Sequence, residues 1–124
     1  MKLICEVKQN LKKRILVVIG TRPEAIKMAP VIEKLSCDSH FDVRLCVTGQ
    51  HKEMLDQVLK IFKLRPEYEL NVMKKNQSLA ALTSSMISKL DNVCEEFKPD
   101  FLFVHGDTAT TLSSAIVGYF NKIK

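Results

Sequence analysis

The chain has 124 residues, of which 46% are hydrophobic and 27% charged, and this balance is typical of a packed globular domain rather than a disordered segment. Nineteen basic residues against 14 acidic ones give a net charge of +5. However, the sequence has no tryptophan, no recognisable nucleic-acid-binding motif and no apolar run long enough to span a bilayer. We therefore expect neither a nucleic acid nor a membrane as a partner.

The four cysteines, Cys5, Cys37, Cys46 and Cys94, are spaced irregularly along the chain. None belongs to a C-x-x-C pair, and no histidine lies near one at metal-ligand spacing, so we expect neither a zinc site nor a disulfide framework. Free thiols favour the cytosol. The N-terminus also lacks the small-residue cleavage site of a secretory signal, which supports a cytoplasmic location.

Apolar residues alternate along the chain between strand-like runs and helical spacing. The run at 14–19 is rich in branched residues and ends at Gly20, which predicts a strand buried on both faces. In chain order, the pattern predicts a strand at 14–19, a helix at 22–35, a strand at 43–47, a helix at 52–62, a short strand at 69–72, a helix at 78–97, a strand at 101–104 and a helix at 108–120.

This alternation predicts an α/β fold with a Rossmann-like parallel sheet and flanking helices, built of right-handed βαβ units. In a doubly wound sheet of order 3-2-1-4, the first and fourth strands are neighbours, and a ligand crevice lies at their carboxyl ends. The segments at that crevice are 20–22 and 105–108. Nothing after Lys124 covers the outer edge of the fourth strand, so we expect the sheet to be incomplete there.

The segment after the first strand contains both a helix start and two basic side chains. Thr21 and Glu24 fit a capping box, and Pro23 suits a first helical turn. Capping does not explain Arg22, because a positive charge at a helix N-terminus is unfavourable unless a bound anion neutralises it. Lys27 lies one and a half turns further on and can reach the same region. Spacing alone leaves an anion site and a purely structural helix start equally open.

The polar residues after the other strands are also open to two interpretations. Asp107 can cap the last helix, or its carboxylate can transfer protons in the crevice. His105 can be a structural hydrogen-bonding residue or a catalyst, and Gln50 and His51 follow the second strand at the crevice rim. The chain has neither a G-x-G-x-x-G fingerprint nor a G-K-[ST] phosphate loop, so we expect no nicotinamide cofactor and no P-loop.

Three stretches, in this order and spacing, resemble the signature of the non-hydrolysing UDP-N-acetylglucosamine 2-epimerases. They are GTRPEAIKMAP at 20–30, TGQHKEMLDQ at 48–57, and FKPD at 97–100 leading to VHGDT at 104–108. The related hydrolysing epimerases depart from the pattern at 23–27. The resemblance covers 13–124, which we interpret as a partial, truncated N-terminal Rossmann-like domain, and it leaves 1–12 as an N-terminal arm.

The resemblance implies a two-domain fold like that of GT-B glycosyltransferases, with UDP-N-acetylglucosamine bound between the domains. It implies conversion to UDP-N-acetylmannosamine by elimination and re-addition of UDP, with no cofactor or metal. It also implies a cytoplasmic homodimer that serves cell-envelope polysaccharide synthesis. Arg22 and Lys27 match family positions near the diphosphate, and Asp107 matches a carboxylate implicated in acid/base work. Gln50 and His51 resemble positions of a regulatory substrate site found in some members.

The family's further glutamates, its histidine and most of its UDP contacts lie beyond Lys124. The missing C-terminal domain is therefore an expected partner, and we expect the chain alone to be inactive. Two alternatives stay open. One is a fragment of a glycosyltransferase of similar fold, which the GTRPE stretch argues against. The other is a non-enzymatic remnant or one half of a split gene.

Overall fold

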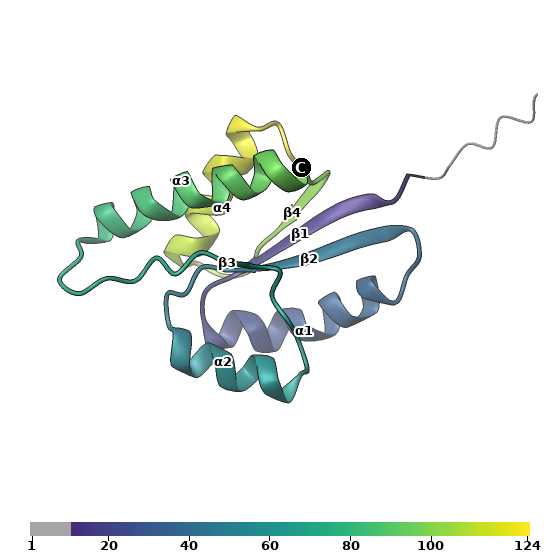
Figure 1. Cartoon of the computed structure of the whole chain (residues 1–124), viewed down its shortest axis with the longest axis horizontal. Helices are drawn as coiled ribbons and strands as arrows, with labels where there is room; N and C mark the ends of the chain where they lie inside the picture. The colour runs from purple at the N-terminus through teal and green to yellow at the C-terminus, as the bar shows by residue number, and fades with distance from the viewer. Residues whose placement is uncertain (1–10) are drawn as a thin grey trace, which may run out of the picture.

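One parallel sheet carries two helices on each face in the computed structural model, which describes residues 11–124 (Figure 1). Most of the predicted N-terminal arm, residues 1–10, lies outside the described residues. In chain order the elements are β1 (Lys13–Ile19), α1 (Arg22–Ser36), β2 (Phe41–Val47), α2 (Lys52–Ile61), β3 (Tyr68–Glu69), α3 (Leu79–Phe97), β4 (Phe101–Phe103) and α4 (Ala109–Phe120). The fold class and all eight predicted elements are confirmed.

The strand order is β3-β2-β1-β4, as predicted, and all three strand pairs are parallel. The third strand is shorter and earlier than the predicted 69–72, since only Tyr68 and Glu69 pair regularly with β2. Leu70 and Val72 still bury their side chains. Their N–H groups donate to the carbonyls of Val47 and Thr48 at 2.9 and 3.0 Å, but the ladder between them is irregular.

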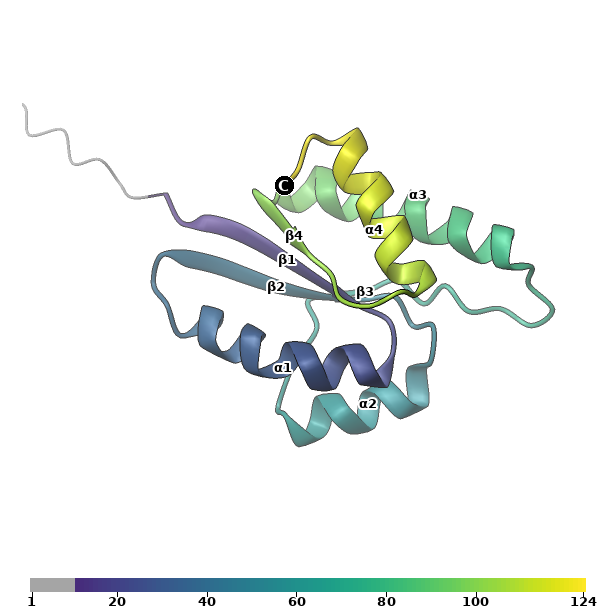
Figure 2. The same cartoon turned by 180° about the vertical axis from the view of Figure 1, so that it is seen from behind.

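Strand β1 separates two apolar cores, because its side chains alternate between the two faces of the sheet. Ile15, Val17 and Ile19 pack against α1 and α2. Leu16 and Val18 pack against α3 and α4 on the opposite face. Figures 1 and 2 show these two helix layers on either side of the sheet. These five side chains are at most 2% exposed, which confirms the predicted burial on both faces for residues 15–19, whereas Arg14 at the start of the predicted strand is exposed.

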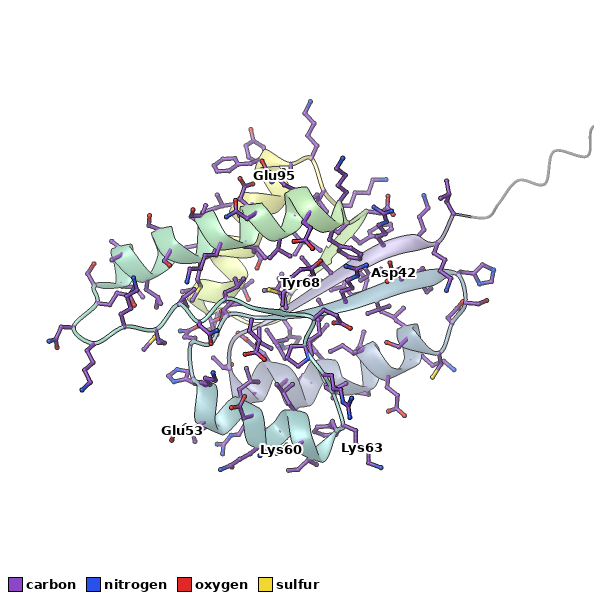
Figure 3. All side chains as sticks on the ribbon, viewed as in Figure 1. Asp42, Glu53, Lys60, Lys63, Tyr68 and Glu95 are labelled. Carbon is purple, nitrogen blue, oxygen red and sulfur yellow. The ribbon has the colours of Figure 1, made fainter. Side chains whose placement is uncertain are left out.

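Arg44 connects the middle of β2 to the end of α3. Its guanidinium carbon lies 4.3 Å from the centre of the Phe97 ring, a cation–π contact. One guanidinium nitrogen also donates to the Tyr68 hydroxyl at 3.0 Å. Tyr68, labelled in Figure 3, packs against the core beneath α3, and its hydroxyl donates to Glu96 at 3.4 Å. These contacts hold the carboxyl-terminal end of α3 against the sheet.

The outer edge of β4 is partly paired, which corrects the expectation that nothing covers it. The N–H of Leu102 donates to the carbonyl of Lys124 at 2.8 Å, and the N–H of Lys124 donates to the carbonyl of Asp100 at 3.4 Å. This is the hydrogen-bond pattern of two parallel strands. Lys124 therefore lies beside β4 on the side away from β1.

Candidate functional site

The connections that follow β1 and β4 leave the sheet at the same end (Figure 2). The two strands are parallel neighbours, paired from Ile15 with Phe101 to Val17 with Phe103. The chain crosses from one face of the sheet to the other between them, because α1 and α2 cover one face and α3 and α4 the other. The structure therefore has the predicted switch point, with the segments 20–22 and 105–108 at its carboxyl end.

Glu24 joins these two segments, although it lies in the first turn of α1. Its Oε2 accepts hydrogen bonds from the N–H groups of Gly20 and Thr21 at 2.6 and 3.0 Å. Its Oε1 accepts a hydrogen bond from the hydroxyl of Thr108, 84 residues further along the chain. The side chain is only 4% exposed. The capping-box pattern predicted the local part of this arrangement, but no local signal in the sequence indicates the bond to Thr108.

Asp107 does not cap α4, so this interpretation of the sequence was wrong. The N-cap is Thr108, whose backbone is extended, and α4 begins at Ala109. Asp107 is exposed and makes no hydrogen bond or ion pair with any residue from 11 to 124. It follows Gly106, whose φ of +97° lies in the region that favours glycine. The carboxylate therefore stands at the crevice without a structural partner among the described residues.

Arg22 and Lys27 are both exposed in the first turns of α1. The ion pairs found within residues 11–124 involve neither of them. The N–H groups of Gly20 and Thr21 already bind Glu24, so an anion here would depend on the two cationic side chains more than on those amides. Both side chains follow β1 at the switch point, and their role in anion binding stays a prediction.

A pair of buried threonines lies beneath the crevice. The hydroxyls of Thr48 and Thr110 are 3.0 Å apart, and each residue is 1% exposed. Thr110 also donates to the side-chain oxygen of Gln50 at 3.2 Å. Gln50 therefore contacts α4 and lies nearer the crevice than the position at its rim that the sequence predicted. His51 is exposed at the N-cap position of α2 and makes no side-chain cap bond. The proposed regulatory role of both residues stays a prediction.

Apart from the buried Glu24, the charged and titratable side chains of the crevice are exposed to solvent, namely those of Arg22, Lys27, His105 and Asp107. Surface cavities of about 640 and 680 Å³ lie elsewhere, one along α3 between Leu79 and Ser88 and one beside α2 between Asp56 and Glu69. Residues 11–124 contain no group of three histidine, cysteine, aspartate or glutamate side chains that could hold a metal ion. No helix in the same range is long and apolar enough to cross a bilayer.

Comparison with known proteins gives a consistent family. The model of the UDP-N-acetylglucosamine 2-epimerase family matches residues 33–124. The UDP-N-acetylglucosamine 2-epimerase of Yersinia pestis is 51% identical over 110 residues, which are 89% of this chain and 29% of that protein. The crystal structure of the Neisseria meningitidis enzyme bound to UDP-GlcNAc superposes with a TM-score of 0.85 at 51% identity, covering 89% of this chain and 30% of that one.

A more distant structure, the UDP-GlcNAc 2-epimerase of Methanocaldococcus jannaschii in complex with UDP-GlcNAc and UDP, gives a TM-score of 0.83 at 31% identity. It covers 90% of this chain and 31% of that one. The chain spans about 30% of the length of the curated relatives it matches. These matches do not favour the glycosyltransferase alternative. The chain belongs to the UDP-N-acetylglucosamine 2-epimerase family.

Proposed function

We propose that this chain forms one wall of the active site of a UDP-N-acetylglucosamine 2-epimerase. The observation that carries the proposal is the shared end of β1 and β4, where Arg22 and Asp107 follow neighbouring strands and the two connections are hydrogen-bonded through Glu24 and Thr108. The Neisseria meningitidis and Methanocaldococcus jannaschii relatives, which share this fold, both have structures with bound UDP-GlcNAc. The substrate is then UDP-N-acetylglucosamine and the product UDP-N-acetylmannosamine.

The proposed reaction is an elimination followed by re-addition. Removal of the proton at sugar C2 breaks the bond from C1 to the diphosphate oxygen, giving 2-acetamidoglucal and UDP. Protonation of C2 on the other face, with re-formation of that C1–O bond, gives the epimer. Arg22 and Lys27 stabilise the departing diphosphate, since cationic donors act most strongly where negative charge develops. Asp107 transfers a proton to or from C2. Its carboxylate is available for this role because no described residue forms a hydrogen bond or ion pair with it.

The opposing wall comes from a C-terminal domain that is not part of this chain. The span of about 30% of the relatives' length supports this proposal.

The complete enzyme is a homodimer in the cytoplasm and serves cell-envelope polysaccharide synthesis. An exposed apolar groove along the first half of α3, where Leu79 is 69% exposed, supports association with another copy. Gln50 and His51 contribute to a regulatory substrate site in that complete enzyme.

A chimera tests the proposed site. Residues 13–124 replace the matching segment of the Neisseria meningitidis relative, and proton NMR follows inversion at sugar C2. Arg22→Ala should lower the rate roughly 100-fold, the usual cost of removing one transition-state donor, without a matching fall in melting temperature. Arg65→Ala is the matched control, because Arg65 is an exposed arginine beside α2, away from the crevice. Parental turnover in Arg22→Ala, together with a lower melting temperature, would contradict the diphosphate role.

A further inference from the structure

Glu24 is a buried carboxylate whose hydrogen-bond donors come from two distant parts of the chain. Two donors are N–H groups of the arginine loop, which we define as residues 20–22. The third is the hydroxyl of Thr108, in the aspartate loop, which we define as residues 105–108. Burying a carboxylate is unfavourable unless its oxygens are hydrogen-bonded. A movement of either loop away from the other would leave an oxygen of Glu24 without its donor.

The aspartate loop also faces Glu24 at Gly106. A Cβ atom placed on Gly106 would lie 3.7 Å from both Cγ and Oε1 of Glu24, an ordinary van der Waals distance. The Glu24 side chain therefore lies about one methyl group away from the backbone that immediately precedes Asp107. This proximity involves the same two loops as the hydrogen bonds.

Thr108 uses its hydroxyl for Glu24 rather than for its own helix. A threonine at an N-cap usually accepts a hydrogen bond from a backbone N–H in the first helical turn. In α4 that local bond is absent, and the Thr108 hydroxyl instead donates to Glu24. Among the described residues, the only hydrogen bond of the Thr108 hydroxyl is therefore the one it donates to Glu24 across the two loops.

We infer that Glu24 is a positioning residue that holds the arginine loop and the aspartate loop as one unit. Through this bridge the separation between Arg22 and Asp107 is fixed before substrate arrives. The inference rests on the proposed function for its purpose. A cationic side chain that binds the diphosphate and a group that transfers a proton can act on one sugar nucleotide only when they are correctly spaced.

The 124-residue chain, labelled with ¹⁵N, allows the bridge to be tested directly. Thr108→Val removes the hydroxyl donor with little change in side-chain volume. The amide signals of Gly20, Thr21 and Arg22 should shift, and protection of the Gly20 amide from hydrogen exchange should fall roughly tenfold, in keeping with the loss of a hydrogen bond to a charged group. Thr108→Ser keeps a hydroxyl and should restore both signals.

Thr83→Val is the matched control, since the Thr83 hydroxyl donates only to the Leu79 carbonyl within α3, at 2.8 Å. Unchanged arginine-loop signals in Thr108→Val, or equal changes in Thr83→Val, would overturn the inference. Glu24→Asp provides a second disruption if Thr108→Val does not fold. The side chain is one methylene shorter and cannot reach both loops, so the Thr108 amide signal should shift. An unshifted Thr108 amide would likewise overturn the bridge.

Titration with UDP separates this inference from the proposed function. In the parent chain, UDP at millimolar concentration should shift the Arg22 and Asp107 amides together, and Thr108→Val should weaken that joint response. If UDP shifts neither amide in the parent while Thr108→Val still perturbs the arginine loop, the nucleotide role fails and the bridge stands. If UDP shifts both amides equally in the parent and in Thr108→Val, the positioning role fails and the nucleotide site stands.

Discussion

Gly20 and Thr110 approach each other so closely that no side chain fits between them. A Cβ atom on Gly20 would lie 2.2 Å from the Thr110 hydroxyl oxygen and 2.6 Å from that of Thr48. Both distances are far shorter than a carbon–oxygen contact allows. The glycine that begins the GTRPE stretch is therefore required by close packing between the end of β1 and the start of α4.

Gly20→Ala should lower the free energy of unfolding by about 1–3 kcal/mol, the usual cost of overpacking a filled core. Gly118→Ala, within α4, is the control. A Cβ there would lie 3.6 Å from the nearest side-chain atom, an ordinary contact, so alanine should stabilise the helix by about 0.5–1 kcal/mol. Urea unfolding of the three proteins measures both effects. A Gly20→Ala chain as stable as the parent would contradict the packing described above.

Asp107→Asn, made in the chimera, should abolish most proton exchange at sugar C2 while leaving the fold intact. The fold should survive because the N-cap of α4 is Thr108 and Asp107 has no described partner. Loss of a general acid or base typically costs about 10²–10⁴-fold in rate. Incorporation of solvent deuterium at C2 is the measurement, and Asp42→Asn, far from the crevice on β2, is the control. Unchanged incorporation would remove Asp107 from the mechanism.

The three described cysteines should differ sharply in reactivity. Cys37 is exposed, whereas Cys46 and Cys94 are buried in the core beneath α3. Burial raises the pKa of Cys46 to about 12 and that of Cys94 to about 11, so neither forms appreciable thiolate at pH 8. In a Cys5→Ser background, one thiol should react rapidly with an aromatic disulfide reagent and two only after unfolding. Cys37→Ser should remove the rapid phase, and a second rapid thiol would contradict the burial.

The same thiols predict the direction of one pH effect on stability. A cysteine in an unfolded chain has a pKa of about 8.5. The pKa values of Cys46 and Cys94 in the folded protein are higher. Their contribution to the free energy of unfolding is therefore fully present below about pH 8.5 and is lost as the pH rises towards 11–12. The free energy of unfolding should therefore fall more steeply above pH 9 in the parent than in a Cys46→Ala, Cys94→Ala variant. Parallel slopes would contradict the raised pKa values.

The isolated chain should not epimerise UDP-N-acetylglucosamine. Its crevice is open on one side, and the chemistry needs a closed cleft that excludes water and retains the released UDP. Affinity for UDP should be no better than about millimolar, roughly −4 kcal/mol. Proton NMR of the purified chain with substrate is the measurement, and the chimera is the positive control. Steady product formation that scales with chain concentration and disappears in Arg22→Ala would refute the need for an opposing wall.

The order of the strands could be predicted because it depends on local periodicity and on the handedness of βαβ connections. Element bounds were less accurate where burial is partial. Strand β2 begins at Phe41 rather than at residue 43, because the half-exposed Phe41 and Asp42 pair with the start of β1. The predicted third strand extends to Val72, and Leu70 and Val72 are indeed buried, although both lie past the end of the regular ladder.

The contacts that build the crevice could not be predicted, because they join residues that are distant in the sequence. Glu24 and Thr108 lie 84 residues apart, and Gln50 and Thr110 lie 60 residues apart. Asp107 and Thr108 are both good N-cap residues, so sequence alone could not decide between them. The position of the helix start made Thr108 the N-cap and left Asp107 without a structural partner.

Strand β1 is equally apolar on both faces, and this has a consequence for how the chain folds. A slip of one residue would exchange the side chains of its two faces with little loss of burial, so hydrophobicity alone cannot select the correct alignment. Specific contacts at both ends make the selection. Arg14 donates through its N–H to Asp100 at 2.8 Å and through its guanidinium to the Phe97 carbonyl at 3.0 Å. At the other end only Gly20 fits against Thr110, so a misaligned strand would bring Ile19 or Thr21 into a steric clash and be rejected.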